Sequence, residues 1–270
     1  MRLNFLNGNS ILLIIFPQQR KTTRVLFPQK IIHKYVGNNL KIDSQMTYKG
    51  ILETNLDVSE IEIKNDFEYL KFEIDGFKFV GTSFDDFELL NYENYSKTEL
   101  ERFSFNKIRC GNRFVYELCD YKLIVNIPTK IKDVETGKAF KENLEMKVEI
   151  GKSIGKGMTE DVKVSLNLKI FNKNYSAINF DFEDGANEII NQIEPKYKFN
   201  NCFGCNYSDY SPYGKAIFGT MLCFKNQKEK YIKVKSKGEF FKLGKEDRIV
   251  QEIYQCSEYE PRGINVGYRG

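Results

Sequence analysis

The feature that most constrains how this chain folds is a strict two-residue alternation of apolar and polar side chains in two successive runs. Successive side chains of a β-strand point to opposite faces, so this alternation predicts antiparallel strands with one buried face. The apolar face comprises Leu144, Met146, Val148 and Ile150 in the first run, and Val162, Val164, Leu166, Leu168 and Ile170 in the second. Both runs therefore favour a mainly β fold.

Shorter runs extend this pattern along the chain. Further strands are expected at 61–63, 70–74, 77–79, 113–118, 122–127 and 175–182. Asp75-Gly76, between the second and third of these, is a strong hairpin signal because the tight two-residue turn needs positive φ angles. Short strands at regular spacing predict an antiparallel β-sandwich or an open barrel.

Two stretches carry helix signals. A convincing helix is predicted at 184–193, where Asp184 can cap the start and Pro195 stops the end. A second, shorter helix is expected to follow Ser96, because Glu99 three residues later completes a capping box. The expected fold class is therefore mainly β, with one short helix of consequence and a minor α contribution.

Charge and amino-acid composition divide the chain into three parts. Residues 1–45 carry seven basic residues and one acidic residue, and they contain His33, the single histidine. We interpret this stretch either as a basic N-terminal extension or as the product of an upstream start, with Met46 as the true start. Residues 46–195 are expected to form the antiparallel β domain, and residues 196–270, rich in Cys, Tyr and Gly, a C-terminal module.

Cysteine spacing in that module predicts a metal site. Cys202 and Cys205 form a C-x2-C knuckle, and Gly204 suits its tight turn. Strands expected at 217–224, 231–235 and 249–256 would form an up-down-up meander that brings Cys223 and Cys256 to the same end. Four thiolates complete a closed tetrahedral site, so the sequence predicts a zinc-ribbon-like module with a structural Zn2+.

Other interpretations of the cysteines stay open. Free cysteines are often small buried hydrophobes, and a C-x2-C pair can be a redox dithiol, although no βαβ pattern surrounds this one. Cys110 and Cys119 are expected to be non-ligands in or beside the core. Six cysteines are too few for a disulfide scaffold, and the longest apolar run, at 11–16, is far shorter than the roughly 20 residues of a membrane span. A soluble cytoplasmic protein without a membrane partner is expected.

Two polar and aromatic stretches flank the predicted ligands. Their residues could either hold the metal loops through hydrogen bonds or form a partner-binding surface. The candidates are Tyr207, Asp209, Tyr210 and Tyr213 after the knuckle, and Glu258, Glu260 and Arg262 after the fourth cysteine.

The same stretches resemble a known family. The motif CFGCNYSDYSPYG at 202–214 and the motif QEIYQCSEYEPR at 251–262 are similar to the hallmarks of an uncharacterised bacterial domain-of-unknown-function family. The resemblance extends from about Met46 to the C-terminus. It implies a bacterial cytosolic protein with these four cysteines, and it implies no activity or substrate.

The leading functional hypothesis is a non-enzymatic protein that binds another protein through the aromatic loop at 206–214. One alternative is a hydrolase that uses Asp209, Glu258 and Glu260 near the metal. The other is a zinc-ribbon protein that binds nucleic acid through the lysines between 225 and 237. Nucleic acid is the less favoured partner, because residues 46–270 contain 34 basic and 36 acidic residues and phosphate binding needs a concentrated basic face.

Overall fold

The computed structural model describes residues 46–66, 69–212, 215–219 and 221–269. The predictions for residues 1–45 lie outside this part of the chain. The strands are β1 (Met46–Thr54), β2 (Val58–Asn65), β3 (Leu70–Ile74), β4 (Phe77–Gly81), β5 (Glu88–Leu89), β6 (Ser104–Cys110), β7 (Arg113–Cys119), β8 (Tyr121–Asp133), β9 (Ala139–Ile150), β10 (Ser153–Gly155), β11 (Met158–Thr159), β12 (Val162–Ile170), β13 (Lys173–Asn179), β14 (Tyr197–Phe199), β15 (Ser208–Tyr210), β16 (Met221–Cys223) and β17 (Arg248–Val250). The helices are α1 (Lys97–Leu100), α2 (Phe182–Gln192), α3 (Lys228–Tyr231) and α4 (Lys237–Phe240), with 3-10 turns at Tyr92–Asn94 and Lys225–Gln227.

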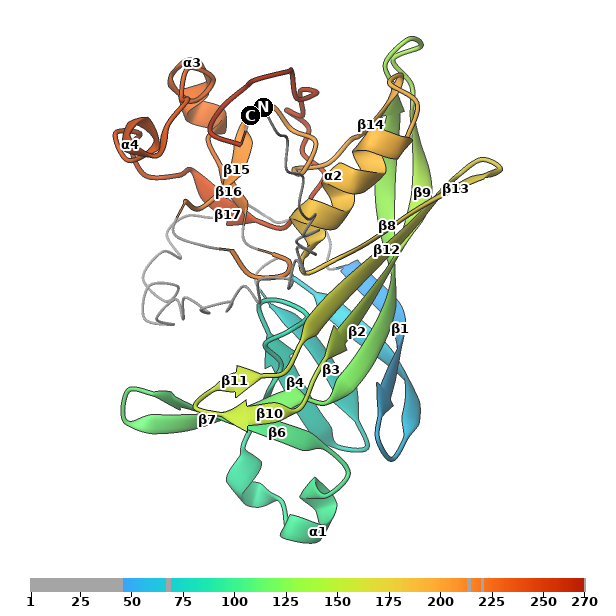
Figure 1. Cartoon of the computed structure of the whole chain (residues 1–270), viewed down its shortest axis with the longest axis vertical. Helices are drawn as coiled ribbons and strands as arrows, with labels where there is room; N and C mark the ends of the chain where they lie inside the picture. Colours follow the sequence, from blue (N-terminus) through green and yellow to red (C-terminus); the bar gives the residue numbers. More distant parts are fainter. Residues whose placement is uncertain (1–45, 67–68, 213–214, 220, 270) are drawn as a thin grey trace, which may run out of the picture.

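One large antiparallel sheet dominates the molecule. Its order is β13-β12-β9-β8-β1-β2-β3-β4-β5-β7-β6, and β14 pairs with β8 beside this path. Figure 1 shows β8, β9 and β12 running along much of the length of the molecule, with β1 to β4 curling away at one end. The prediction of a mainly β, antiparallel fold is confirmed in this form, as an open curled sheet in which β13 and β6 end the order.

The alternation in the sequence accounts for the centre of this sheet. β12 pairs with β9 so that Leu166 lies opposite Met146 and Val164 opposite Val148. All four side chains are buried in the main apolar core, while their neighbours along each strand face the other side. Burying one face of each strand fixes the register, because a slip of one residue would expose every apolar side chain.

Local signals place the predicted turn and the short helix. Asp75 and Gly76 both have positive φ angles, and β3 pairs with β4 around them. At α1, the Ser96 hydroxyl accepts from the Glu99 amide, and the Glu99 carboxylate accepts from the Ser96 amide. This reciprocal capping satisfies amides that would otherwise lack partners at the helix start.

The main helix, α2, begins two residues before the predicted start. Its cap is Asp181, whose carboxylate accepts from the Asp184 amide at 2.9 Å. The strand predicted to continue to residue 182 ends at Asn179, because Phe182 opens the helix and buries its ring in the core. In the described part of the chain, no helix combines the length and the apolar character of a membrane-crossing segment.

The C-terminal part departs from the predicted meander. The stretch 231–235, expected as a strand, is the end of α3 and a turn, because Tyr231 and Val234 both point into a second apolar cluster with Phe224 and Phe240. The strands expected at 217–224 and 249–256 shorten to β16 and β17, and β15 forms where a loop was expected. These three strands make a separate small sheet in the order β15-β16-β17.

The main apolar core contains side chains from both sides of residue 195, the predicted boundary between the β domain and the C-terminal module. Phe203, Phe218 and Met221 from the C-terminal part belong to the same buried cluster as the large sheet. The Phe218 ring stacks on Phe84 at 4.9 Å and meets the Phe182 ring at 5.7 Å. The predicted division between a β domain and a C-terminal module therefore does not coincide with a gap in the core.

Candidate metal centre

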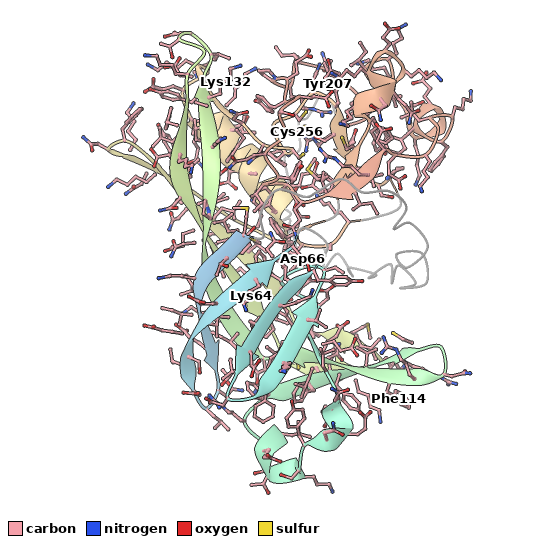
Figure 2. All side chains as sticks on the ribbon, turned by 180° about the vertical axis from the view of Figure 1, so that it is seen from behind. Lys64, Asp66, Phe114, Lys132, Tyr207 and Cys256 are labelled. Carbon is pink, nitrogen blue, oxygen red and sulfur yellow. The ribbon has the colours of Figure 1, made fainter. Side chains whose placement is uncertain are left out.

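Three separate stretches of chain bring the four candidate cysteines together. The Cys202 amide donates to the Tyr254 carbonyl at 2.9 Å, so the knuckle lies against the stretch that leads to Cys256. Cys223 ends β16 and pairs with Arg248 of β17. Figure 2 shows Cys256 in the same part of the molecule as Tyr207, to one side of the end of β8 that carries Lys132.

The route by which Cys223 and Cys256 approach each other differs from the prediction. The two strands were expected to point the same way with one strand between them, but β16 and β17 are antiparallel neighbours. Cys256 instead returns through the turn after β17, and the Arg248 guanidinium reaches its sulfur at 3.5 Å. Arg248 also hydrogen-bonds the Cys223 side chain, so one guanidinium contacts both cysteines.

The charges of the four thiols influence one another. Burial raises the pKa of the Cys202 thiol well above its usual value, and Cys205, Cys223 and Cys256 raise it further because thiolates repel. Burial also raises the pKa of Cys223, against the lowering effect of the Lys225 amide and Arg248. Buried thiols of this kind stay protonated unless a cation compensates the thiolate charge.

The residues present suit a metal ion held by sulfur. Amides two residues after a cysteine donate to its sulfur in two places, Lys225 to Cys223 and Glu258 to Cys256, the latter at 3.4 Å. Arg248 adds a positive charge beside a set that would carry a net charge of −2 with zinc. All six cysteines of the chain are free, and Cys110 and Cys119 lie on β6 and β7, apart from this cluster.

The side chains do not form a finished coordination cage. Among the described residues, no group of three or more His, Cys, Asp or Glu side chains is arranged to hold a metal ion as it stands. The four sulfurs are electrostatic neighbours without a common bonding point, so coordination would require their side chains to rotate towards one ion. Thiolates form short bonds to zinc, about 2.3 Å, which protonated thiols cannot form.

Backbone shape at the knuckle depends on glycine. A Cβ atom on Gly204 would lie 2.1 Å from the Phe199 carbonyl oxygen, which is far inside contact distance. The Gly204 amide donates to the Asn201 side-chain oxygen at 3.3 Å. The knuckle therefore packs directly on the end of β14, and only glycine fits there without a shift of the backbone.

The aromatic stretch after the knuckle is internal. Tyr207, Asp209 and Tyr210 are all buried. The Asp209 carboxylate accepts from the Tyr231 hydroxyl at 2.7 Å and from the Arg269 amide at 3.1 Å. Tyr207 and Tyr210 are thus packed within this chain, and Tyr213 lies outside the described residues.

The residues after the fourth cysteine tie the loops together. Arg262 donates to the carbonyls of Cys205 at 3.3 Å and Ser208 at 2.9 Å. Glu260 accepts from the Tyr207 hydroxyl, and Glu258 forms an ion pair with Lys225 at 2.7 Å. These hydrogen bonds and the ion pair join the residues after Cys256 to the knuckle, to β15 and to the stretch after β16.

Sequence reasoning missed a buried carboxylate near this centre. Glu252 is fully buried and accepts from the Tyr210 hydroxyl at 3.0 Å and from the Gly219 amide at 2.6 Å. Burial raises its pKa to about 7. Beside it, Gln251 accepts from Asn65, which links this stretch to β2. Both residues belong to the 251–262 motif, but the strand expected there gave no sign that they would point inward.

Comparison with known proteins identifies one family. A family model with the description "Family of unknown function (DUF6304)" matches residues 46–208. The matched stretch contains the large sheet, α2, Cys202 and Cys205, and it begins at Met46. The resemblance to an uncharacterised family is confirmed. No curated protein and no solved structure matches the chain.

Proposed function

The chain belongs to DUF6304, a family of unknown function, and we propose that it is a non-enzymatic protein-binding protein whose C-terminal part is stabilised by a structural zinc ion. The observation that carries the zinc proposal is the convergence of four buried or half-buried thiols from three separate stretches. Four thiolates fill a tetrahedral zinc ion and leave no position for a substrate, so such an ion supports the fold and does not catalyse.

The C-terminal part has a physical need for such an ion. Its strands β15, β16 and β17 are three residues long, and its second apolar cluster is small. Binding of structural zinc supplies about 10–16 kcal/mol in zinc-finger peptides at neutral pH, which becomes folding free energy. A single ion would add a further link between the knuckle, β16 and the turn after β17.

The proposed binding surface is the outer side of α3 and α4, which we call the lysine face (residues 225–245). Eight lysines and two acidic residues lie in this stretch. Tyr231, Val234 and Phe240 point inward and anchor it, whereas Ile232 and Phe241 are 36% and 45% exposed. Figure 1 shows α3 and α4 on the side of the small sheet that faces away from the large one. Exposed apolar side chains among cations suit an acidic protein surface.

The carboxylates of the hydrolase alternative are already engaged. Asp209 accepts from Tyr231 and Arg269, and Glu260 accepts from Tyr207. A general base must be able to reach a substrate proton, and these groups are committed to holding the loops. The nucleic-acid alternative is favoured by one observation, the concentration of lysines on the lysine face.

Hydrogen exchange tests the zinc part of the proposal. Addition of a strong zinc chelator under reducing conditions should remove amide protection from 202–256 and leave 121–170 protected, because the large sheet does not depend on the ion. Cys223→Ser should behave like the chelated protein, and Cys119→Ser should behave like the untreated protein. Equal protection of 202–256 with and without chelator would contradict the proposal.

A charge-reversal variant tests the binding part. Lys230, Lys233 and Lys242 are exposed and form no ion pair with a described residue. Their simultaneous replacement by Glu should abolish capture of a partner protein while the protection of 202–256 stays intact. If the variant loses affinity for single-stranded RNA and keeps the protein partner, the nucleic-acid alternative is favoured instead.

A further inference from the structure

The last described residues fold back over the knuckle and β15, and we call them the C-terminal strap (residues 261–269). The strap begins beside the knuckle, where the Arg262 amide donates to the Gly204 carbonyl at 2.8 Å. It ends over β15, where the Arg269 amide donates to the buried Asp209 carboxylate at 3.1 Å. The strap therefore lies across the aromatic stretch that follows the knuckle.

The guanidinium of Arg269 lies against two aromatic rings. Its central carbon is 4.6 Å from the centroid of the Phe203 ring and 5.8 Å from that of the Tyr210 ring. Its Nη2 also donates to the Phe203 carbonyl. A planar guanidinium can stack on an aromatic face and donate hydrogen bonds in its own plane, which suits this arrangement better than an ammonium does. We call Phe203, Asp209 and Tyr210 the arginine cage.

The charges around the arginine cage favour a cation. Burial and then the Arg262 charge lower the pKa of the Arg269 guanidinium, whereas the nearby acids raise it. Apart from Arg269, the charged groups are the acids Asp181, Glu183 and Asp209 and the bases Lys215 and Arg262. These five groups carry a net charge of −1, and Arg269 brings it to zero. Glu252, bonded to the Tyr210 hydroxyl, adds negative charge above its pKa of about 7.

Arg269 satisfies the arginine cage incompletely. Its Nη1 is buried and has no hydrogen-bond partner among the described residues, and a buried donor without a partner costs free energy. The end of the strap also buries few apolar side chains, because Ile264 is 92% exposed and Tyr268 is 36% exposed. Gly267, which passes closely over the Tyr231 ring, has no side chain to bury. The end of the strap is therefore held mainly by polar contacts that another segment could make.

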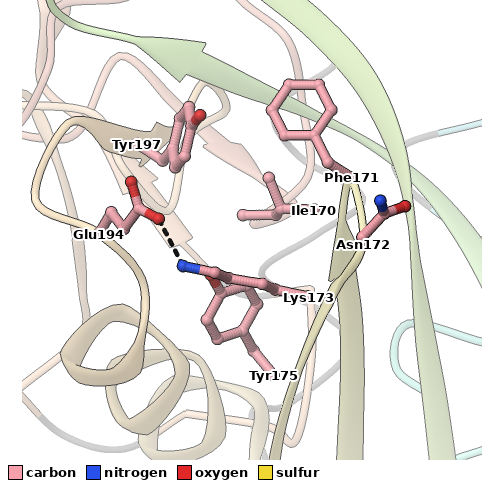
Figure 3. A pocket seen from close by; sticks show the side chains of 7 residues that line it. All are labelled: Ile170, Phe171, Asn172, Lys173, Tyr175, Glu194 and Tyr197. Atoms are coloured by element: carbon pink, nitrogen blue, oxygen red, sulfur yellow. Dashed lines mark hydrogen bonds and ion pairs between the residues drawn. The ribbon is translucent and has the colours of Figure 1, made fainter.

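A small cavity at the tip of the β12–β13 hairpin offers no comparable site. Its volume is about 170 Å3, and its charged rim is matched within the chain. The Lys173 ammonium lies 2.7 Å from the Glu194 carboxylate, and Figure 3 shows this ion pair beside the cavity. Lys196 lies 3.6 Å from the second oxygen of Glu194 and is also influenced by Glu135.

We propose that the arginine cage is a recognition site for an arginine-bearing segment of a partner protein, and that the C-terminal strap occupies it as an intramolecular competitor. The two rings and the Phe203 carbonyl would hold the guanidinium, and Asp209 would accept from a backbone amide of the entering segment. This inference goes beyond the proposed function, because it uses neither the lysine face nor a bond between a metal ion and sulfur.

Arg269→Ala empties the arginine cage, and ethylguanidinium tests whether the cage then takes a guanidinium from solution. At about 50 mM it should raise the melting temperature of Arg269→Ala by about 3 °C relative to its effect on the natural protein, for a dissociation constant on the order of 10 mM. Ethylammonium should give at most about a fifth of this gain. Arg109→Ala, at an exposed position of β6, is the control and should show no relative gain. No relative gain in Arg269→Ala, or an equal gain with ethylammonium, would overturn the proposal.

The peptide acetyl-Gly-Tyr-Arg-amide, which repeats residues 267–269, tests the competition. It should bind Arg269→Ala at least about tenfold more tightly than the natural protein, because the tethered Arg269 competes at a high effective concentration. Binding should shift the amide NMR signals of 203–210, and acetyl-Gly-Tyr-Lys-amide should bind at least about fivefold more weakly. Equal affinity for Arg269→Ala and the natural protein would mean that the strap does not compete, and the proposal would fail.

Hydrogen exchange of the natural protein gives a test that does not depend on the folding of a variant. The Arg269 amide should exchange at least about tenfold faster than the Phe224 amide, after correction for intrinsic rates, because the strap opens locally. Both amides are hydrogen-bonded in the closed protein, Arg269 to Asp209 and Phe224 to the Tyr207 carbonyl at 2.8 Å. Exchange of both amides at one rate would mean that the strap leaves only on unfolding, and it would overturn the proposal.

Discussion

Replacement of Glu252 by Gln should make the protein more stable, and the gain should grow as the pH rises. Glu252 is fully buried, and its two carboxylate oxygens accept from the Tyr210 hydroxyl and the Gly219 amide. Burial disfavours the charged form and raises its pKa from 4.5 to about 7. A glutamine side chain has the same shape and stays neutral, with an oxygen to accept from Gly219 and an amide to face Tyr210.

The sign and size of the effect follow from proton linkage. Between pH 4.5 and pH 7 the unfolded chain has lost the Glu252 proton and the folded chain keeps it, so the free energy of unfolding falls as pH rises through this window. The loss is complete above pH 7. The two pKa values give a fall of about 2.5 kcal/mol between pH 5 and pH 8 from this one group. The variant Glu252→Gln lacks this contribution.

Urea unfolding at pH 5, 6, 7 and 8 measures the difference directly. The free energy of unfolding of Glu252→Gln minus that of the natural protein should increase across this series by about 2.5 kcal/mol. Glu229→Gln, at an exposed position, corrects for the general effect of removing one carboxylate. A difference that stays constant from pH 5 to pH 8 would show that Glu252 is ionised in the folded protein, and it would refute the reasoning.

Two further predictions concern backbone and capping. Gly204→Ala should lower the free energy of unfolding by at least about 2 kcal/mol in thermal or urea unfolding, because its Cβ would collide with the Phe199 carbonyl. Gly238→Ala, which would meet no atom within 4 Å, should be neutral or slightly stabilising, and an equal effect at both glycines would contradict the packing argument. Asp181→Ala should cost about 1 kcal/mol through loss of the α2 cap, measured in the same assay. No change on this replacement would mean that the cap is not formed in solution.

The sequence allowed good prediction where a local rule decides the structure. The alternation of apolar and polar residues correctly predicted which side chains of β9 and β12 are buried. The Asp75-Gly76 pair correctly predicted the turn between β3 and β4. The order of strands in the sheet could not be predicted, because β1 pairs with β8 across some 70 residues and no local signal specifies such a partner.

Errors arose where tertiary packing outweighed local pattern. Tyr231 and Val234 fit a strand or a helix equally well in sequence, and their contact with Phe224 and Phe240 selects the helix. The cysteine set was predicted from spacing, but the route of the chain between Cys223 and Cys256 was not. Nor could the sequence indicate that Arg248 would contact both of these cysteines, because the contact depends on the pairing of β16 with β17.

The most direct test of the account is the zinc content of the purified full chain, measured by elemental mass spectrometry together with a count of reactive thiols. We expect one zinc ion per chain and protection of four thiols from alkylation, with the ion lost in Cys223→Ser and retained in Cys119→Ser. A protein that is folded throughout 202–256, contains no bound metal and exposes all four thiols equally to alkylation would contradict it.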